Sequence, residues 1–301
     1  MIGYQHFMTV GGTSFPYTDQ GVEENAEAIM GDDLHTGQRS TMHFSPGVIR
    51  YAGPISTHMH VTATSLLKTW AVTSYDTAQT VIIDTGNQAG GRGRYRYNLK
   101  VGTWELTGNP EGSVDTTVNT YGWGSDATDR TRESFDNGSI LSDLPPVMNT
   151  HDYAPIPWYL SSWVCTLASN LTQLTWGTAA ATYVTAWNVT INNNQASLGK
   201  FDGYQVTDIQ QATTLSVEGS FTLYNASGIR PPSGPRDWFS CRLDLVQTQT
   251  SEGVFGSAAS YLNFPVCVPT AYPDAGAARN AKKTLTINWT GMGDGTNPAV
   301  Y

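Results

Sequence analysis

The sequence predicts a mainly β protein with two tandem domains, each a β-sandwich or open barrel carrying one short helix. Three observations support this fold class. Charged residues make up only 14% of the 301 residues, while Thr, Val, Tyr and Trp are plentiful, which favours strands over helices. Long segments alternate between apolar and polar residues. Several stretches of the second half also repeat the first half at a nearly constant spacing.

The strongest alternation lies between residues 183 and 224. The apolar residues that share one face are Tyr183, Trp187, Val189 and Ile191 in the first segment and Leu215, Val217, Phe221 and Leu223 in the second. Because side chains alternate along a strand, both segments are expected to be strands with one buried face. Asn192, Asn193 and Asn194 end the first strand, since Asn favours turns. A polar loop from Asn192 to Gln211 then leads to the second strand.

The first half contains several shorter elements of this kind. Residues 65–71 (SLLKTWA) predict a short helix. The alternation of residues 94–106 changes phase at Gly102, which predicts a β-bulge there. Residues 22–30 are acidic and fit no single state. The remaining expected strands and apolar runs lie at residues 6–10, 41–50, 53–62, 81–83 and 112–124.

Residues 125–155 have a different composition, first charged and then rich in turn-forming residues, with Pro145-Pro146 near the end. Such a composition is typical of a linker. We therefore expect a first β domain at residues 1–130, a linker at residues 131–155 and a second β domain at residues 156–301.

Four matches in the same order indicate that the second domain is a duplicate of the first. TTVNTYGWG from residue 116 aligns with TLTINWTGM from residue 284, and YNLKV from residue 97 has the spacing of LNFPV from residue 262. The segment around Gly53 lies over the segment around Gly219, and SLLKTW falls near PRDWFSCRLDLV. We expect Gly53 to be equivalent to Gly219, and Tyr121 to be close to the position of Trp289.

Charge and cysteine content exclude several classes of protein. The net charge is −9, whereas a protein that grips nucleic-acid phosphates needs a basic surface. The three cysteines, Cys165, Cys241 and Cys267, fit no metal-ligand spacing, and we expect buried free thiols. No signal segment is evident at the N-terminus, and no segment approaches the roughly 18 apolar residues of a membrane span.

No set of residues predicts catalysis, a cofactor or a metal centre. His58 and His60 are expected to share a strand face and could hold a metal, but no third ligand stands beside them. Carboxylates occur in turn-like contexts, where solvated turn residues are the usual interpretation. These are Asp32, Asp33, Asp126, Asp129 and Asp294. We expect no enzyme activity and no bound cofactor.

Two other functions remain open from the residues alone. Nine tryptophans fit a carbohydrate-binding or glycoside-processing β-sandwich, because exposed aromatic rings stack on sugars. A capsid or decoration protein of a virus also fits a β-rich chain of this composition. Against the carbohydrate reading, Trp104, Trp187 and Trp289 lie within expected strands, where core packing is usual.

The segment from Tyr183 to Tyr224 resembles the tail tube proteins of long-tailed bacteriophages. It has a strand with a central aromatic residue, a run of Asn, a long loop, and a strand of the form hydrophobic-x-Gly-Ser-x-Thr-Leu. Residues 261–295 resemble the same family. The resemblance implies a virion protein that assembles with copies of itself, inside the host bacterial cytoplasm, into stacked rings that form a hollow tail tube for DNA. It also implies contact with tape measure protein and with tail terminator and distal tail proteins.

The resemblance further suggests where subunits meet. The loop Asn192–Gln211 would reach the next ring, be mobile in a free subunit and become ordered there. The residues proposed for such contacts are Asn192, Asn193, Leu198, Phe201, Tyr204 and Gln211. Because known tubes resemble rings of six domains per layer, a chain with two domains predicts a trimer with pseudo-sixfold symmetry, with a hexamer as the alternative. The lumen should be acidic or neutral, so that passing DNA is not retained.

Overall fold

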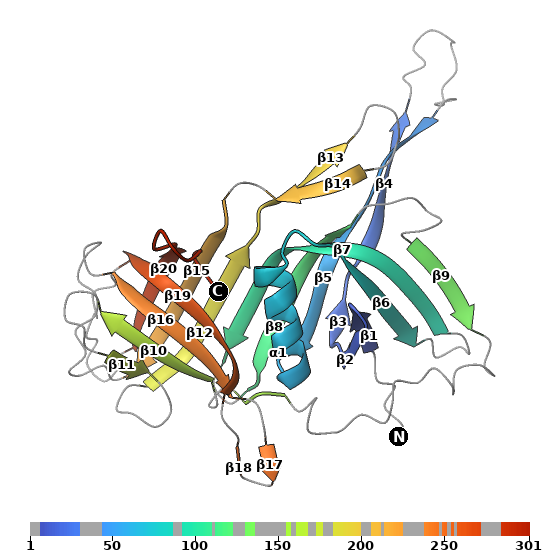
Figure 1. Cartoon of the computed structure of the whole chain (residues 1–301). Helices are drawn as coiled ribbons and strands as arrows, with labels where there is room; N and C mark the ends of the chain where they lie inside the picture. Colours follow the sequence, from blue (N-terminus) through green and yellow to red (C-terminus); the bar gives the residue numbers. More distant parts are fainter. Residues whose placement is uncertain are drawn as a thin grey trace.

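The computed structural model confirms a mainly β protein (Figure 1). It describes residues 7–30, 44–86, 92–109, 112–122, 130–135, 155–157, 161–167, 173–176, 183–199, 206–211, 214–224, 238–246, 249–251, 254–255, 258–271 and 284–301. One large antiparallel sheet contains strands from both halves of the chain, and one short helix lies in front of it.

The first half of the sheet has the order β4-β5-β8-β7-β6-β1-β2, with β3 beside β5 next to β4 and β9 beside β7. The bounds of these strands are β1 Phe7–Val10, β2 Thr13–Pro16, β3 Asp19–Gln20, β4 Glu23–Met30, β5 Phe44–His58, β6 Gln79–Gly86, β7 Arg92–Gly108, β8 Val114–Gly122 and β9 Arg130–Phe135.

The second half of the sheet has the order β12-β15-β20-β19-β16-β10-β11. Its strands are β10 Ser161–Leu167, β11 Gln173–Trp176, β12 Tyr183–Asn192, β15 Ser216–Tyr224, β16 Phe239–Val246, β19 Ala258–Ala271 and β20 Thr284–Met292. Two small hairpins pair outside the large sheet. They are formed by β13 Gln195–Gly199 with β14 Val206–Gln211, and by β17 Gln249–Ser251 with β18 Val254–Phe255.

The two halves follow the same strand order. Position by position, β4, β5, β8, β7, β6, β1 and β2 correspond to β12, β15, β20, β19, β16, β10 and β11. The match extends to irregularities, because β7 shifts register against β8 between Val101 and Thr103, and β19 shifts against β20 between Pro269 and Ala271. The first shift also confirms the bulge predicted at Gly102.

The register corrects two details of the expected alignment. Gly53 lies opposite Thr120, whereas Gly219 lies opposite Trp289. With the two glycines equivalent, Trp289 therefore corresponds to Thr120 and not to Tyr121. Burial agrees with this correction, since Thr120 and Trp289 are each 1% exposed while Tyr121 is 40% exposed. Val101, opposite Thr120, then corresponds to Pro269, opposite Trp289, and not to Val266 as the match of YNLKV with LNFPV implied.

A single junction joins the halves within the sheet. The C-terminal part of β7, Thr103 to Gly108, pairs with β12 from Asn192 to Trp187. The N-terminal part of β7 pairs instead with β6 along the same edge. Strand β7 is long enough to pair with β6 and then with β12. The bulge between these two parts shifts the alternation by one residue, so that Leu99 before it and Trp104 after it are both buried on the same face.

Several expected elements differ in extent. The strands expected at residues 41–50 and 53–62 form one strand, β5, and the acidic segment at residues 22–30 forms β4, paired with it. Propensity alone misses β4 because β-sheet stability depends on the partner strand. The expected linker begins with part of β9, which pairs with β7; most of the remaining linker residues lie outside the described ranges.

The helix forms as expected, with earlier bounds. Helix α1, Val61–Lys68, begins at His60, whose Nδ1 accepts a hydrogen bond from the backbone N–H of Ala63 at 3.2 Å. A π-helical turn, η1 Thr69–Thr73, follows and buries Trp70. The expected match of this helix with PRDWFSCRLDLV, residues 235–246, is wrong, because Phe239–Val246 forms strand β16. The described residues of the second half include no helix.

Aromatic side chains dominate the core of the second half. Trp163 lies with its ring centroid 4.6 Å from that of Phe221, and Trp289 lies 5.2 Å from Phe264. Trp289 also packs flat against the backbone of Gly219, where an added Cβ would meet the indole at 2.2 Å. These tryptophans are therefore core residues, as expected for Trp within strands.

Candidate assembly interface

The face of the large sheet opposite the core is polar across both halves. Directly paired residues form one row that crosses eight neighbouring strands, from β3 to β19. The row consists of Asp19, Ser56, Thr117, Glu105, Thr190, Glu218, Thr290 and Val268. A parallel row runs from His58 through Asp115, Thr107, Asn188, Ser220 and Asn288 to Ala271. We call this surface the polar sheet face.

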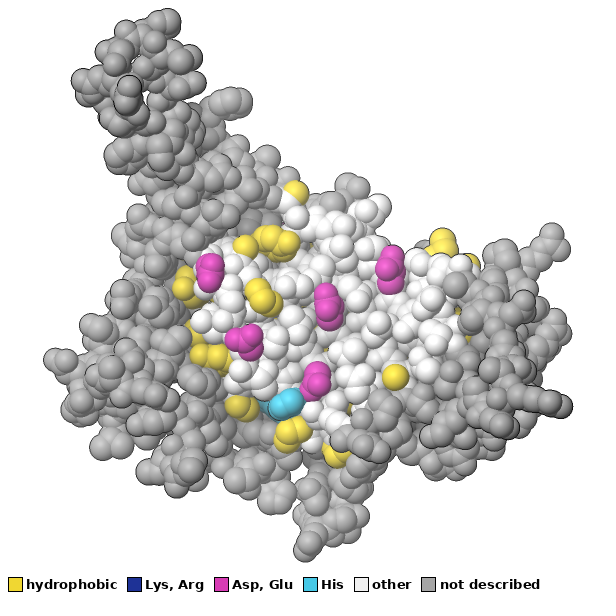
Figure 2. Space-filling model, turned by 180° about the vertical axis from the view of Figure 1, so that it is seen from behind, with side chains coloured by type: hydrophobic (Ala, Val, Ile, Leu, Met, Phe, Trp, Pro, Cys, Tyr) yellow, Lys and Arg dark blue, Asp and Glu magenta, His cyan; other side chains and the backbone are white. Residues whose placement is uncertain are grey.

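The charges on the polar sheet face are acidic. Asp19, Glu105 and Glu218 are exposed, and Asp115 is half-buried. Neither row contains Lys or Arg. Figure 2, viewed from behind, shows scattered acidic side chains on a mostly uncharged surface, with no Lys or Arg visible among the described atoms. The alternation of the sequence predicts that these acidic residues lie on the polar faces of their strands. It does not predict that these strands lie side by side.

A shallow depression of about 380 Å³ lies on this face over β12, β15 and β20. Hydroxyl and amide groups line most of it, together with Gly219, Trp289 and one carboxylate, Glu218. Asn188 accepts a hydrogen bond from the Ser220 hydroxyl at 2.8 Å, so part of the polar lining is already paired within the chain. The depression is open and lacks a convergent set of acids or bases, which a catalytic site needs.

Asn193 does not fit its expected role as a contact between subunits. Its side chain is fully buried, and its amide donates hydrogen bonds to the carbonyl oxygens of Ala71 at 3.0 Å and Val101 at 3.1 Å. Its backbone N–H also donates to the carbonyl of Gly102. Asn193 therefore fastens the turn after β12 to η1 and to the bulge of β7 inside one subunit.

The other proposed contact residues lie at or near the β13–β14 hairpin. The loop expected from Asn192 to Gln211 contains this hairpin, which projects from the sheet in Figure 1, and Gln195 pairs with Gln211 at its base. Leu198 is in β13, and Asn192 ends β12, where its carboxamide oxygen accepts a hydrogen bond from the N–H of Asn194. Phe201 and Tyr204 lie outside the described residues. Strand β14 contacts β5, so the hairpin stands beside the projecting β4–β5 pair.

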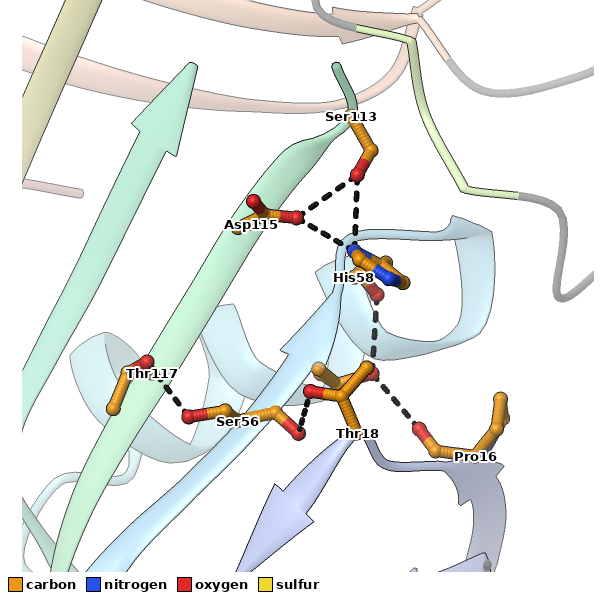
Figure 3. Close-up of polar contacts among 8 residues, drawn as sticks. Pro16, Thr18, Ser56, His58, Ser113, Asp115 and Thr117 are labelled. Carbon is orange, nitrogen blue, oxygen red and sulfur yellow. Dashed lines mark hydrogen bonds and ion pairs between the residues drawn. The ribbon is translucent and has the colours of Figure 1, made fainter. Parts of the chain in front are cut away.

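His58 and His60 point to different environments, contrary to the expected shared face. His60 is buried at the start of α1, while His58 is exposed. The Nδ1 of His58 lies 2.6 Å from Asp115 Oδ1, and the Ser113 hydroxyl lies 2.9 Å from each of these atoms (Figure 3). A Ser-His-Asp triad needs Ser and Asp on opposite ring nitrogens. Here both contact Nδ1, so this geometry does not form a catalytic relay.

The three thiols gather in the core of the second half. Cys165 lies opposite Cys241 in the ladder, and the Sγ atoms of Cys241 and Cys267 are 3.4 Å apart. All three are buried, as predicted. Burial raises the pKa of Cys165 and of Cys241 above the usual range of a thiol, so these groups remain protonated and unreactive in the folded chain.

Asp294, one of the expected turn carboxylates, lies in the segment after β20. Hydrogen bonds from the backbone and side chain of Asn297 and from the backbone of Thr296 lower its pKa. Asp32, Asp33, Asp126 and Asp129 lie outside the described residues. Within the described ranges, no group of three or more His, Cys, Asp or Glu residues could hold a metal ion, and no described helix is long and apolar enough to cross a membrane.

A further contact between the halves involves α1. Lys68 donates a hydrogen bond to the carbonyl oxygen of Tyr261 at 2.7 Å, and its ammonium lies 4.6 Å from the centre of the Tyr261 ring. Arg242 approaches the same ring at 5.4 Å and pairs with Asp244 at 2.8 Å. The helix of the first half therefore rests on β19 of the second, which supports the junction of β7 with β12.

The comparison with protein families finds one match. The model of the family described as phage tail tube protein matches residues 5–229, about three quarters of the chain. No curated protein matches the chain. The family match covers the first half, the junction of β7 with β12 and the strand pair that suggested the resemblance. The chain belongs to the phage tail tube protein family.

Proposed function

We propose that three copies of this chain close into a ring whose continuous β-barrel lines the tail tube, and that such rings stack. The protein is a structural component of the virion tail tube, and the family match gives no support to a carbohydrate-binding or capsid function. The observation that carries the proposal is the single sheet that crosses both halves with a polar, acid-bearing face.

The repeated strand order supports six equivalent units in a ring. Each half contributes four strands to the polar sheet face, and we propose that the halves are tandem copies of one domain. Closing the barrel removes exposed sheet edges, which otherwise promote aggregation. Three chains would then give a barrel of about 24 strands, roughly 50 Å across between backbones for spacings near 4.8 Å and a tilt near 40°. Six chains would double that width if both halves line the tube.

We assign the polar sheet face to the lumen. Its opposite face is buried against α1 and the aromatic core, so only the polar face is available for a solvent-filled channel. Exposed carboxylates such as Glu105 and Glu218 repel phosphate groups, whereas a basic wall would bind DNA by releasing its counterions. DNA would therefore pass without being retained. Tape measure protein would occupy the same lumen during assembly, and terminator and distal tail proteins would cap the ends of the tube.

Ring stacking would use elements that project along the tube. The β13–β14 hairpin and the β4–β5 pair extend from the same side of the sheet (Figure 1), and we retain Asn192, Leu198, Phe201, Tyr204 and Gln211 as proposed contacts between rings. Asn193 is removed from this set because its side chain is buried within the subunit.

Electron microscopy of the purified full-length chain tests the proposal. Rings or tubes are expected at high protein concentration, with an open lumen. A protein that remains monomeric at all concentrations and binds immobilised glycans would instead support the carbohydrate-binding alternative.

A further inference from the structure

The pairing of β7 with β12 inside one chain indicates which strands pair between neighbouring chains. Within one chain, β12 of the second half pairs with the C-terminal part of β7 in the first half. The strand that corresponds to β12 in the first half is the combined line of β3 and β4. Among the described strands, β3 and β4 pair only with β5, so their other edge faces no described strand of the same chain.

The register of β3 and β4 defines their correspondence with β12. Both strands continue one ladder along β5, with Gln20 opposite Ile55 and Glu23 opposite Ala52. This ladder brings Val22 to the position opposite Gly53, just as Val189 lies opposite Gly219. Val22 and Val189 are both buried. By the same count, Asn25 corresponds to Asn192, and the two residues have the same type.

Strand β19 of the second half corresponds to β7 of the first half, which pairs with β12. Asn119 lies opposite Thr103 in the first half, and its counterpart Asn288 lies opposite Ala271 in the second. Thr103 is the first residue of β7 after the bulge and pairs with Asn192 of β12. Ala271 holds the equivalent place on β19, four residues beyond Cys267, where the ladder with β16 ends.

We propose that β4 of one copy meets the end of β19 in the next copy as an antiparallel neighbour, with Asn25 opposite Ala271. The partner is therefore a second copy of this chain, and the contact is strand addition at a sheet edge. This inference rests on the proposed ring, and it supplies the edges and the register that the ring requires. It also makes the interface between chains heterologous, so that the rotation from one copy to the next closes the ring.

Paired cysteines test this register. Asn25→Cys and Ala271→Cys together are expected to form a disulfide between chains when assembled protein is oxidised, because directly opposite residues of antiparallel strands fall within the range of Cα separations that a disulfide spans. On a non-reducing gel the ladder of cross-linked species should end at three chains. Each single variant and the parent protein, whose three thiols are buried, should show no ladder.

Two matched pairs serve as controls. Thr103→Cys with Asn192→Cys reproduces the same geometry inside one chain, and should give an internal disulfide without a ladder. Asn25→Cys with Val268→Cys shifts one partner by two ladder positions, because the bulge of β19 lies between Val268 and Ala271. This shift is roughly 7 Å along the strand, and the pair should give no cross-link. A ladder from this shifted pair would overturn the proposed register.

The outcomes separate the inference from the proposed function. Tubes of normal appearance without the Asn25–Ala271 cross-link would overturn the inference and leave the ring intact, whereas failure of the parent protein to form any ring would overturn the proposed function. If the double variant does not assemble, a map of parent tubes decides the question. Asn25 and Ala271 of adjacent copies should lie directly opposite each other, and separation by more than one strand would contradict the pairing.

Discussion

Asn193 connects the turn after β12 to two elements of the first half. Its buried carboxamide serves two carbonyl groups, those of Ala71 and Val101, which belong to η1 and to the residue before the bulge. Burying a carbonyl without a hydrogen-bond donor is costly. The position of the turn after β12 therefore depends on the side chain of Asn193.

Replacing Asn193 with Ala should reduce the free energy of unfolding by about 2–4 kcal/mol, because two buried carbonyl groups lose their donor. Asn188→Ala is the matched control, since Asn188 is an exposed Asn of β12, the strand that precedes Asn193. Its effect should be below about 1 kcal/mol. Urea unfolding followed by circular dichroism measures both values. Equal effects of the two substitutions would show that Asn193 has no special structural role.

Gly219 provides a second test at the level of a residue. An added Cβ would lie 2.2 Å from the indole of Trp289, so Gly219→Ala should displace that ring and cost about 1–3 kcal/mol. Gly112→Ala is the control, because its Cβ would meet only the carbonyl oxygen of Asn109, at 3.7 Å. Thermal unfolding with tryptophan fluorescence reports both stability and ring displacement. An unchanged melting temperature for Gly219→Ala would contradict the packing.

The buried thiols should make stability depend on pH. Burial raises the pKa of Cys165 and Cys241 in the folded chain, whereas the unfolded chain loses these protons above about pH 8.5. The unfolded state then binds fewer protons, so stability is full below that pH and falls as pH rises, by up to about 1.4 kcal/mol per pH unit for each thiol.

Urea unfolding at several pH values from 7 to 10 measures this decline. The variant Cys165→Ala/Cys241→Ala should show a shallower decline than the parent, and the comparison of slopes removes the contributions of Tyr and Lys residues that titrate in both proteins. Identical slopes would mean that the two thiols ionise in the folded state as readily as in the unfolded state.

Sequence patterns predict the roles of such residues only in part. The three asparagines from Asn192 to Asn194 predict a turn at the end of β12, and the turn exists. The partners of Asn193 could not be inferred, because Ala71 and Val101 lie about 120 and 90 residues away in the chain. Likewise the alternation assigns Trp289 to the buried face, but the repeat aligned it with Tyr121, one residue from its true counterpart. A one-residue error exchanges the two faces of a strand.

The β13–β14 hairpin is the element whose removal best separates folding from assembly. Its base is formed by Gln195 and Gln211, which lie opposite each other. Replacing residues 196–210 with Gly-Gly should therefore join Gln195 to Gln211 through a two-residue turn. We expect a melting temperature within a few degrees of the parent value, since the hairpin pairs outside the large sheet.

The shortened chain should form single rings but no stacked tubes. Size-exclusion chromatography and negative-stain microscopy distinguish these products. A control that keeps the hairpin and replaces exposed Ala196 with Ser should assemble normally. Normal tubes from the shortened chain would show that the hairpin does not connect rings.

At the scale of elements, the sequence predicts helices and strands with a strong pattern of their own. It does not predict strands that form only because of a partner strand. The helix at SLLKTWA and the strands β7, β12 and β15 follow from periodicity within their own residues. Strand β4 is acidic and takes strand form through its ladder with β5. The polar loop after β12 carries no alternating apolar pattern, yet its residues pair through the backbone as β13 and β14.

At the scale of the whole molecule, the sequence predicted β domains and an internal repeat, whereas the single sheet needed the structure. Nothing local in β7 indicates that its two ends pair with different halves of the chain. The polar sheet face follows from this arrangement, because it brings Asp19, Glu105 and Glu218 into one row across β3, β7 and β15. The proposed lumen wall is thus a property of the assembled sheet.

A three-dimensional reconstruction of tubes assembled from the full-length chain tests the central claim most directly. We expect three chains per ring, six sheet units around the lumen, and Glu105 and Glu218 facing the channel. Six copies of the chain per ring, or a channel lined mainly by Arg92, Arg94 and Arg96 with the two glutamates on the outside, would contradict the account.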